Sequence, residues 1–128
     1  MGELLRDQEL TPDLIISSDA VRARLTAAAV AEAAGYAGEI ALDPRLYHAG
    51  PAEIVAVLRE LPAATPQRVL IVGHNPGLET FVTRVTGEHA DFPTAALAHI
   101  ELPLDRWSEL ADSTHGTLVA LWRPKERA

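Results

Sequence analysis

The chain has 128 residues, enough for one compact domain and too few for two ordinary ones, and its composition of 48% hydrophobic and 23% charged residues excludes an intrinsically disordered protein. Acidic residues outnumber basic ones 18 to 11 and the single lysine is Lys125, so there is no polybasic stripe with which to bind nucleic acid or an anionic membrane. The absence of cysteine excludes disulfides, thiolate metal sites and cysteine nucleophiles.

The first ten residues do not have the pattern of a targeting segment. They carry three acidic residues around a short apolar run, whereas a signal peptide has a basic start and a longer apolar centre. No apolar stretch approaches the length of a membrane span. We therefore expect a cytoplasmic protein that contacts neither membranes nor nucleic acid.

From residue 13 onward the hydrophobic pattern alternates between strand-like runs and helical spacing, as in βαβ units. Residues 13–17 form a short apolar run with β-branched members and predict a buried strand. We predict a helix over 18–34, with Ser18 as its cap and Gly35 as its stop. The face of this helix that we expect to be buried carries Val21, Leu25, Ala28 and Ala29.

The middle of the chain repeats this alternation. A short strand is predicted over 39–42, followed by a helix that begins at Pro51 and is closed by Pro62. The clearest strand covers 68–73, and a helix over 76–86 follows it. The apolar residues predicted to be buried by these two helices are Ile54, Val55, Leu58 and Leu61 in the first, and Leu78, Phe81, Val82 and Val85 in the second.

The pattern changes after Gly87. Residues 95–102 and 117–122 are both strand-like, with a helical turn predicted over 104–110, and we expect the two strands to pair antiparallel. The predicted architecture is a single α/β domain over 1–128, mostly parallel in its first two thirds and with right-handed crossovers.

Ligands of such sheets bind beyond the carboxyl ends of the strands. Residues 17–19 and 73–76 each follow a predicted strand and lead into a helix. Each turn therefore places unpaired backbone N–H groups and the positive end of a helix dipole at the same end of the sheet. This arrangement favours an anionic ligand.

Arg22 lies one turn inside the predicted 18–34 helix, where a cation opposes the dipole by about 0.3–1 kcal/mol. A bound phosphoryl group would offset this cost, because a guanidinium fork matches two of its oxygens. The alternative is an ordinary i, i+3 ion pair with Asp19 on a solvated face. Spacing alone does not decide between the two.

His74 follows the clearest strand, and Asn75 is placed to cap the helix that Pro76 begins. A histidine at this point can donate a hydrogen bond to a phosphoryl oxygen, act as a nucleophile or transfer a proton. The alternative is an imidazole that only fills or caps the turn. We favour the functional interpretation because catalytic residues concentrate at such strand ends.

These segments resemble the histidine phosphatase superfamily. Ser18–Ala27 is similar to its Ser-Pro-x-x-Arg-Ala-x-Gln-Thr-Ala segment, and Val72–Pro76 resembles its second catalytic segment. The similarity is closest to the small SixA-like phosphohistidine phosphatases, and it extends to Leu46–Ala49, Pro93–Leu97 and Leu121–Pro124. Each motif alone is weak, but their order and spacing together are specific.

The resemblance implies a phosphoglycerate-mutase-like, three-layer α/β/α fold and a phosphate pocket of two histidines and two arginines, one histidine being transiently phosphorylated. By position, Arg22 would bind phosphate, and His74 would be the second, catalytic histidine that donates to the phosphoryl oxygens. Ser18, Asn75 and His48 are candidates for the pocket rim. The implied substrate is phosphohistidine on a protein, or a small phosphate ester, and no cofactor is expected.

The sequence departs from the family pattern in one decisive way. The family's nucleophile lies in an Arg-His-Gly or Arg-His-Ala segment that ends its first strand, and no Arg-His pair occurs in the 128 residues. Residues 2–10 resemble the tail of the helix after that strand, so we interpret the sequence as lacking it; a native short helix is the alternative. Because the family's first strand is central, we expect a trough in the core, unpaired strand edges and a chain that folds poorly alone. Asp19 and Leu25 are lesser departures, in place of a proline and a glutamine.

Other groups of residues support a catalytic or metal site less strongly. Ser17 or Ser18, His74 and Asp91 are the residue types of a hydrolase triad, but no Gly-x-Ser-x-Gly elbow is present. The remaining histidines lack metal-site spacing, so no metal is expected. Three interpretations stay open: a phosphatase whose nucleophile lies outside this sequence, a phosphate-binding module without activity, and a non-functional fragment.

Overall fold

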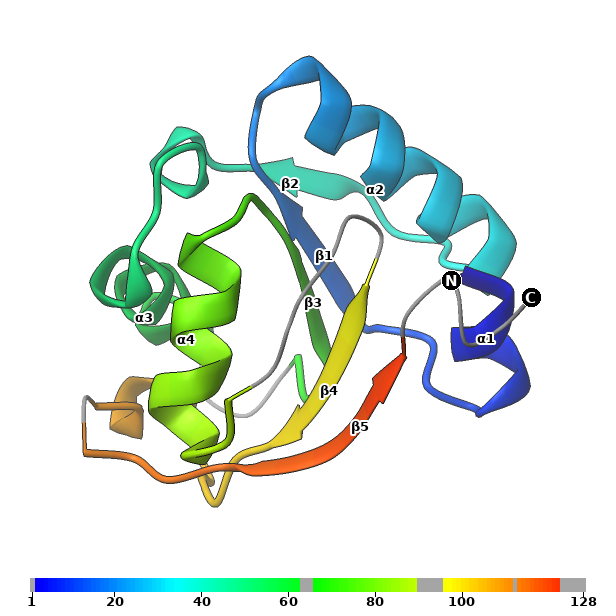
Figure 1. Cartoon of the computed structure of the whole chain (residues 1–128). Helices are drawn as coiled ribbons and strands as arrows, with labels where there is room; N and C mark the ends of the chain where they lie inside the picture. Colours follow the sequence, from blue (N-terminus) through cyan, green and yellow to red (C-terminus); the bar gives the residue numbers. More distant parts are fainter. Residues whose placement is uncertain (1, 63–65, 90–95, 112, 123–128) are drawn as a thin grey trace.

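The structure is a computed structural model, and it describes residues 2–62, 66–89, 96–111 and 113–122 (Figure 1). Helices and strands alternate along most of the chain, as the sequence predicts. In chain order the elements are α1 (Gly2–Asp7), β1 (Leu14–Ser17), α2 (Val21–Ala34), β2 (Ile40–Leu42), the 3-10 helix η1 (Pro44–Leu46), α3 (Pro51–Arg59), β3 (Val69–Val72), α4 (Gly77–Thr86), β4 (Leu97–Glu101), the 3-10 helix η2 (Trp107–Glu109) and β5 (Thr117–Trp122).

The strands form two sheets. β1 lies in the middle of a parallel sheet of order β2-β1-β3, and β4 pairs antiparallel with β5. Ser17 pairs with Leu42 of β2 and with Val72 of β3, so the three parallel strands end together. We call this the carboxyl end of the sheet.

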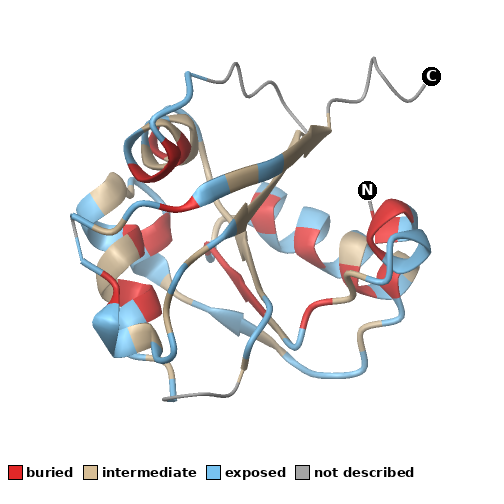
Figure 2. Ribbon diagram, turned by 90° about the horizontal axis from the view of Figure 1, so that it is seen from below, coloured by how far each residue is buried: buried red, intermediate tan, exposed pale blue. Residues whose placement is uncertain are grey.

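β1 is buried on both faces, which explains its unbroken apolar run. Ile15 packs against Ala27 and Ala31 of α2, while Ile16 belongs to a second cluster built around α3. Helices therefore cover opposite faces of the parallel sheet, with the buried residues concentrated in β1 and on the inward helix faces (Figure 2). The predicted three-layer α/β/α arrangement is confirmed.

The buried face of α2 differs from the prediction. Val21 and Leu25 are 62% and 67% exposed, and Ala28 and Ala29 are exposed as well. A stripe of small residues faces the sheet instead: Ala23, Ala27, Ala31 and Ala34. The helix follows its alanine period because methyl groups let its backbone lie close to the branched side chains of the sheet. The prediction placed the larger apolar residues inward and was wrong.

The later elements lie close to their predicted positions. β5 has the predicted bounds, the predicted turn over 104–110 is the 3-10 helix η2, and β4 has a register irregularity between His99 and Ile100. In α4, Val82 and Val85 are buried as expected, whereas Leu78 and Phe81 are only half-buried against the α3 cluster. Among the described residues, no helix is both long and apolar enough to cross a membrane.

An ion-pair cluster ties the loop after β2 to the end of α3. The Asp43 carboxylate accepts from the Arg45 backbone N–H (2.9 Å) and caps η1. The Arg45 guanidinium pairs with Asp43 and Glu60, each at 2.7 Å. Hydrogen bonding to Arg45 lowers the pKa of both carboxyl groups below their ordinary values of 3.8 and 4.5.

This cluster predicts a pH-dependent contribution to stability. Because the folded-state pKa values of Asp43 and Glu60 are lowered, the contribution is present above their ordinary values and disappears as the pH falls through the lowered ones. Arg45→Gln should therefore reduce the urea midpoint slightly at pH 7 and not at pH 2, since the pairs are solvent-exposed. Arg24→Gln, an exposed arginine on α2, is the control. An equal loss at both pH values would contradict the assignment.

Candidate active site

Three loops meet at the carboxyl end of the sheet. The Ser18 backbone N–H donates to the Val72 carbonyl (2.9 Å), and the Asp43 N–H donates to the Ser17 carbonyl (2.9 Å). These bonds extend the strand pairing by one step and hold the turns after β1, β2 and β3 beside one another (Figure 1). Helices α2 and α4 begin from two of these turns, so their N-termini lie at the same end of the sheet, as predicted.

Ser18 and His74 are in direct contact, although 56 positions separate them in the sequence. His74 Nε2 lies 2.9 Å from Ser18 Oγ, and Ser18 is fully buried. The same Oγ accepts from the Ala20 backbone N–H at 3.2 Å. The hydroxyl thus fixes both the turn that leaves β1 and the imidazole that follows β3.

The predicted cap at Ser18 requires a correction. α2 begins at Val21, its N-cap residue is Ala20, and no side chain caps it. Residues 18–20 instead connect β1 to α2. Ser18 therefore precedes the N-cap position, and its hydroxyl does not bond to the N–H groups of the first helical turn. Its structural role is to hold His74.

The Tyr47 ring stands next to His74. The Tyr47 ring contacts the His74 ring edge-to-face, with ring centroids 5.3 Å apart. The Tyr47 ring also contacts the His48 ring edge-to-face, with ring centroids 4.2 Å apart. His48 is exposed, and its expected place on the pocket rim stays a prediction. Sequence reasoning missed Tyr47; its only signal was its place within the Leu46–Ala49 motif.

Asn75 bonds to the first turn of the second helix, although the N-cap position itself is Pro76, and its expected place on the pocket rim stays a prediction. Its Oδ1 accepts from the Glu79 backbone N–H at 3.3 Å, and the His74 carbonyl accepts from the Leu78 N–H at 3.1 Å. The helix begins at Gly77, one residue later than predicted. The backbone on both sides of His74 is thereby fixed by β3 and by α4.

Arg22 is the second residue of α2 and its side chain is exposed. It forms no ion pair with Asp19, so the ordinary i, i+3 pair that was the alternative interpretation is not present. Within the described ranges no hydrogen bond joins Arg22 to His74 either. Its cation therefore stands at the positive end of a helix dipole without an anionic partner among the described residues.

Several predicted residues lie outside the described part of the chain. These are Asp91 of the alternative triad, Pro93–Ala95 in one family-like stretch, and Arg123–Pro124 in another. Among the residues that are described, no group of three or more histidine, cysteine, aspartate or glutamate side chains could hold a metal ion.

Comparisons with known proteins add a fold assignment. No family model matches the chain, and no curated protein matches it by sequence. The structure of a protein named phosphohistidine phosphatase SixA, from Nakamurella multipartitia, matches with a TM-score of 0.81 at 23% identity, over 96% of this chain and 77% of that one. The chain has the fold of the SixA histidine phosphatases.

Two other SixA structures agree. One, from Agrobacterium tumefaciens, has a TM-score of 0.76 at 27% identity and covers 96% of this chain and 75% of that one. The other is SixA complexed with tungstate, with a TM-score of 0.81 at 22% identity and 99% and 78% coverage. The resemblance seen in the motifs around Arg22 and His74 is confirmed at the level of a SixA-like fold.

Proposed function

We propose that this SixA-like domain is a phosphatase domain that binds the phosphoryl group of a phosphohistidine-bearing protein, or of a small phosphate ester, at the carboxyl end of the sheet. The observation that carries the proposal is the His74 imidazole held by a buried serine where two helices begin. The names of the three SixA neighbours support the substrate class, and tungstate in one of them is a tetrahedral oxyanion like phosphate.

In this proposal each group has a separate role. The Arg22 guanidinium binds two phosphoryl oxygens, and the α2 and α4 N-termini favour the negative charge. We assign the Ser18 hydroxyl, which accepts from the Ala20 N–H, as the donor to His74 Nε2. With that assignment the His74 proton lies on Nδ1, from which it donates to a phosphoryl oxygen as negative charge develops during transfer.

His74 does not also serve as the nucleophile. One imidazole cannot attack phosphorus in line and at the same time stabilise the oxygens of the same phosphoryl group. The 128 residues contain no Arg-His pair of the kind that the family resemblance associates with the nucleophile. We therefore assign His74 to phosphoryl binding and not to nucleophilic attack.

A tungstate titration tests the binding site. The 128-residue chain should bind tungstate, and His74→Gln should weaken binding about 10- to 100-fold, since a hydrogen bond to a charged group contributes about 1.5–3 kcal/mol. The matched control is His115→Gln, an exposed histidine near the start of β5. Calorimetry gives both dissociation constants.

Two results would contradict the proposal. Unchanged affinity in His74→Gln would remove His74 from the phosphoryl site. Hydrolysis of p-nitrophenyl phosphate by the 128-residue chain, abolished in His74→Ala, would show that the nucleophile lies within these residues.

A further inference from the structure

One exposed aromatic ring stands beside the proposed phosphoryl site. Tyr47 is 47% exposed, and it is the only exposed side chain among the phenylalanines, tyrosines and tryptophans of the described ranges. An aromatic ring carries a large apolar surface and a π-system, so an exposed ring next to a binding site is a candidate for contact with the ligand. The function proposed above gives Tyr47 no role.

The backbone of residues 46–49 passes close to the chain on both sides of His74. A Cβ at Gly73 would lie 3.8 Å from the carbonyl oxygen of the first residue of this segment, and a Cβ at Gly77 would overlap the carbonyl oxygen of the last. Tyr47 lies between these two points of close approach. Its backbone is therefore held beside His74 from two directions.

The 3-10 helix η1 fixes the chain just before Tyr47. The Tyr47 backbone N–H donates to the Pro44 carbonyl at 3.1 Å and closes this helix, and Leu46 is only 1% exposed. The ion pairs of Arg45 tie the same helix to the end of α3. A ring carried by such a backbone loses little conformational freedom when a ligand contacts it.

The Tyr47 ring itself lies between two imidazoles. Its plane makes an angle of 65° with that of His74 and of 83° with that of His48. The Tyr47 hydroxyl forms no hydrogen bond with another described residue. Ring contacts, and not the phenolic O–H, therefore define where this side chain lies.

A phosphate compound bound at His74 extends toward the solvent side of the imidazole. The inner side is closed, because Ser18 is fully buried and its Oγ lies 2.9 Å from His74 Nε2. The group that carries the phosphoryl group thus leaves the site on the exposed side, where the Tyr47 ring touches the imidazole. That group and Tyr47 are neighbours in the bound state.

We propose that Tyr47 is a specificity-determining residue, which packs against a planar ring bonded directly to the phosphoryl group. The imidazole of a phosphohistidine and the ring of an aryl phosphonate are such rings. Each can meet Tyr47 edge-to-face, as the two imidazoles of this chain already do, or in an offset stack. An aliphatic phosphate gains no such contact. The inference rests on the proposed function, because it takes the phosphoryl group to bind at His74.

Two phosphonates that differ only in the ring on phosphorus provide the test. Phenylphosphonate carries a planar ring, whereas cyclohexylphosphonate carries a saturated ring of similar size that offers apolar surface without a π-system. Calorimetric titration of the 128-residue chain should give a dissociation constant about 3- to 10-fold lower for phenylphosphonate, the range that one aromatic pair contributes.

Variants of Tyr47 assign this preference to its ring. Tyr47→Leu should abolish the preference, whereas Tyr47→Phe should keep it, because the ring remains and the hydroxyl has no described partner. Val119→Ala is the matched control, since Val119 is also 47% exposed but lies on β5 in the other sheet. Tungstate has no ring, so its affinity should stay within about twofold in all three variants.

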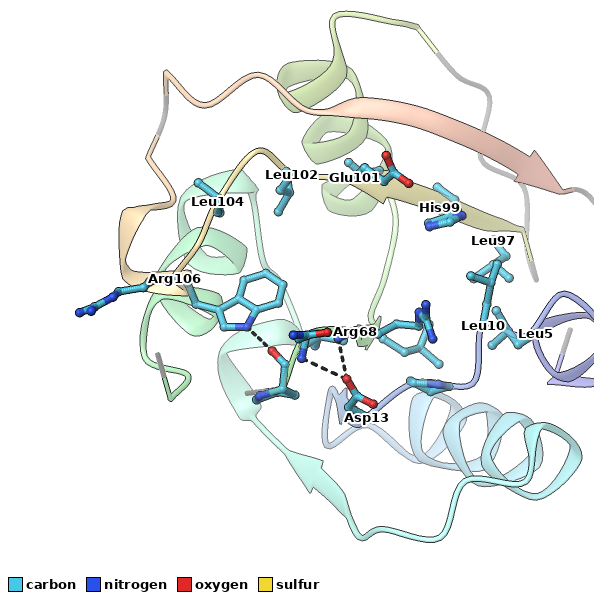
Figure 3. Close-up of a pocket in the computed structure, with 18 of the residues that line it drawn as sticks. Leu5, Leu10, Asp13, Arg68, Leu97, His99, Glu101, Leu102, Leu104 and Arg106 are labelled. Atoms are coloured by element: carbon cyan, nitrogen blue, oxygen red, sulfur yellow. Dashed lines mark hydrogen bonds between the residues drawn. The ribbon is translucent and has the colours of Figure 1, made fainter. Parts of the chain in front are cut away.

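The cavity drawn in Figure 3 is a second place where an aromatic probe could bind. It has a volume of about 700 Å³, and its lining includes Trp107 and Trp122 but neither Tyr47 nor His74. Saturating tungstate separates the two places, because it should displace phenylphosphonate from the phosphoryl site and leave binding in the cavity unchanged. We expect complete displacement.

Four results would overturn the inference. The first is equal affinity of the unmodified chain for the two phosphonates, and the second is a preference that survives in Tyr47→Leu. The third is an equal loss of tungstate and of both phosphonates in Tyr47→Leu, which would show that Tyr47 acts only by holding His74. The fourth is phenylphosphonate binding that persists in saturating tungstate.

The outcome for tungstate separates this inference from the proposed function. If tungstate binding depends on His74 while any of these four results is found, the proposed function stands and the role of Tyr47 is wrong. If the chain binds neither tungstate nor the two phosphonates, both proposals are wrong.

Discussion

Arg22→Ala is expected to weaken tungstate binding by about 10- to 100-fold. This range corresponds to the loss of one charge-assisted interaction of about 1.5–3 kcal/mol. The same substitution should leave the folded chain intact or make it slightly more stable, by about 0.3–1 kcal/mol, because it removes a cation from the positive end of α2. Calorimetric titration and urea unfolding of the same preparation measure both effects.

Arg24→Ala is the control for this experiment. Arg24 lies two residues further along the same helix, is also exposed, and its replacement changes the net charge by the same amount. It should leave the affinity within about twofold of the unmodified chain, because side chains two positions apart on a helix do not share a face. Equal losses in the two variants would mean that tungstate responds to overall charge and not to a site at Arg22.

Gly77→Ala should be the most damaging single-methyl change in the chain. A Cβ at Gly77 would overlap the Ala49 carbonyl oxygen. This oxygen belongs to the backbone, so it cannot rotate away as a flexible side chain could. The contact lies between the first turn of α4 and the loop that carries His48. We expect a loss of about 1–3 kcal/mol or more in the free energy of unfolding, measured with urea, together with weaker tungstate binding.

Gly73→Ala separates this overlap from a general effect of removing glycine. A Cβ at Gly73 would meet the Leu78 side chain at 3.5 Å and the Leu46 carbonyl oxygen at 3.8 Å, and both are ordinary van der Waals contacts. The substitution should therefore change stability by less than about 1 kcal/mol, although it lies next to His74. Comparable losses of unfolding free energy in the two variants would show that the close approach of α4 to the Ala49 loop is not the reason why Gly77→Ala destabilises the chain.

The order of elements and the parallel sheet could be predicted from the sequence because apolar periodicity is a local signal. The 117–122 and 13–17 strands, the Gly35 stop and the common end of the sheet all follow from it. The buried face of α2 could not be predicted in the same way. Alanine is neutral in a hydrophobic pattern, and only the closeness of the sheet decides that methyl groups point inward.

The candidate site was predicted in part. The positions of Arg22 and His74 at helix starts follow from the strand-to-helix turns, and the family-like motifs identified both residues. The bond between Ser18 and His74 could not be predicted, because it depends on the pairing of β1 with β3 across 56 positions. A cavity of about 700 Å³ lies beside β3 and β4, where the family resemblance led us to expect a trough in the core.

The alanine stripe of α2 has a consequence for variation far from the carboxyl end of the sheet. The 14-residue helix is about 20 Å long, and its distance from β1 is set by methyl groups alone. A bulkier residue at Ala31 would push the distal end of the helix outward and tilt its axis, which would reorient the first turn and with it Arg22. Sequence changes remote from any ligand could in this way tune oxyanion affinity among natural variants of the domain.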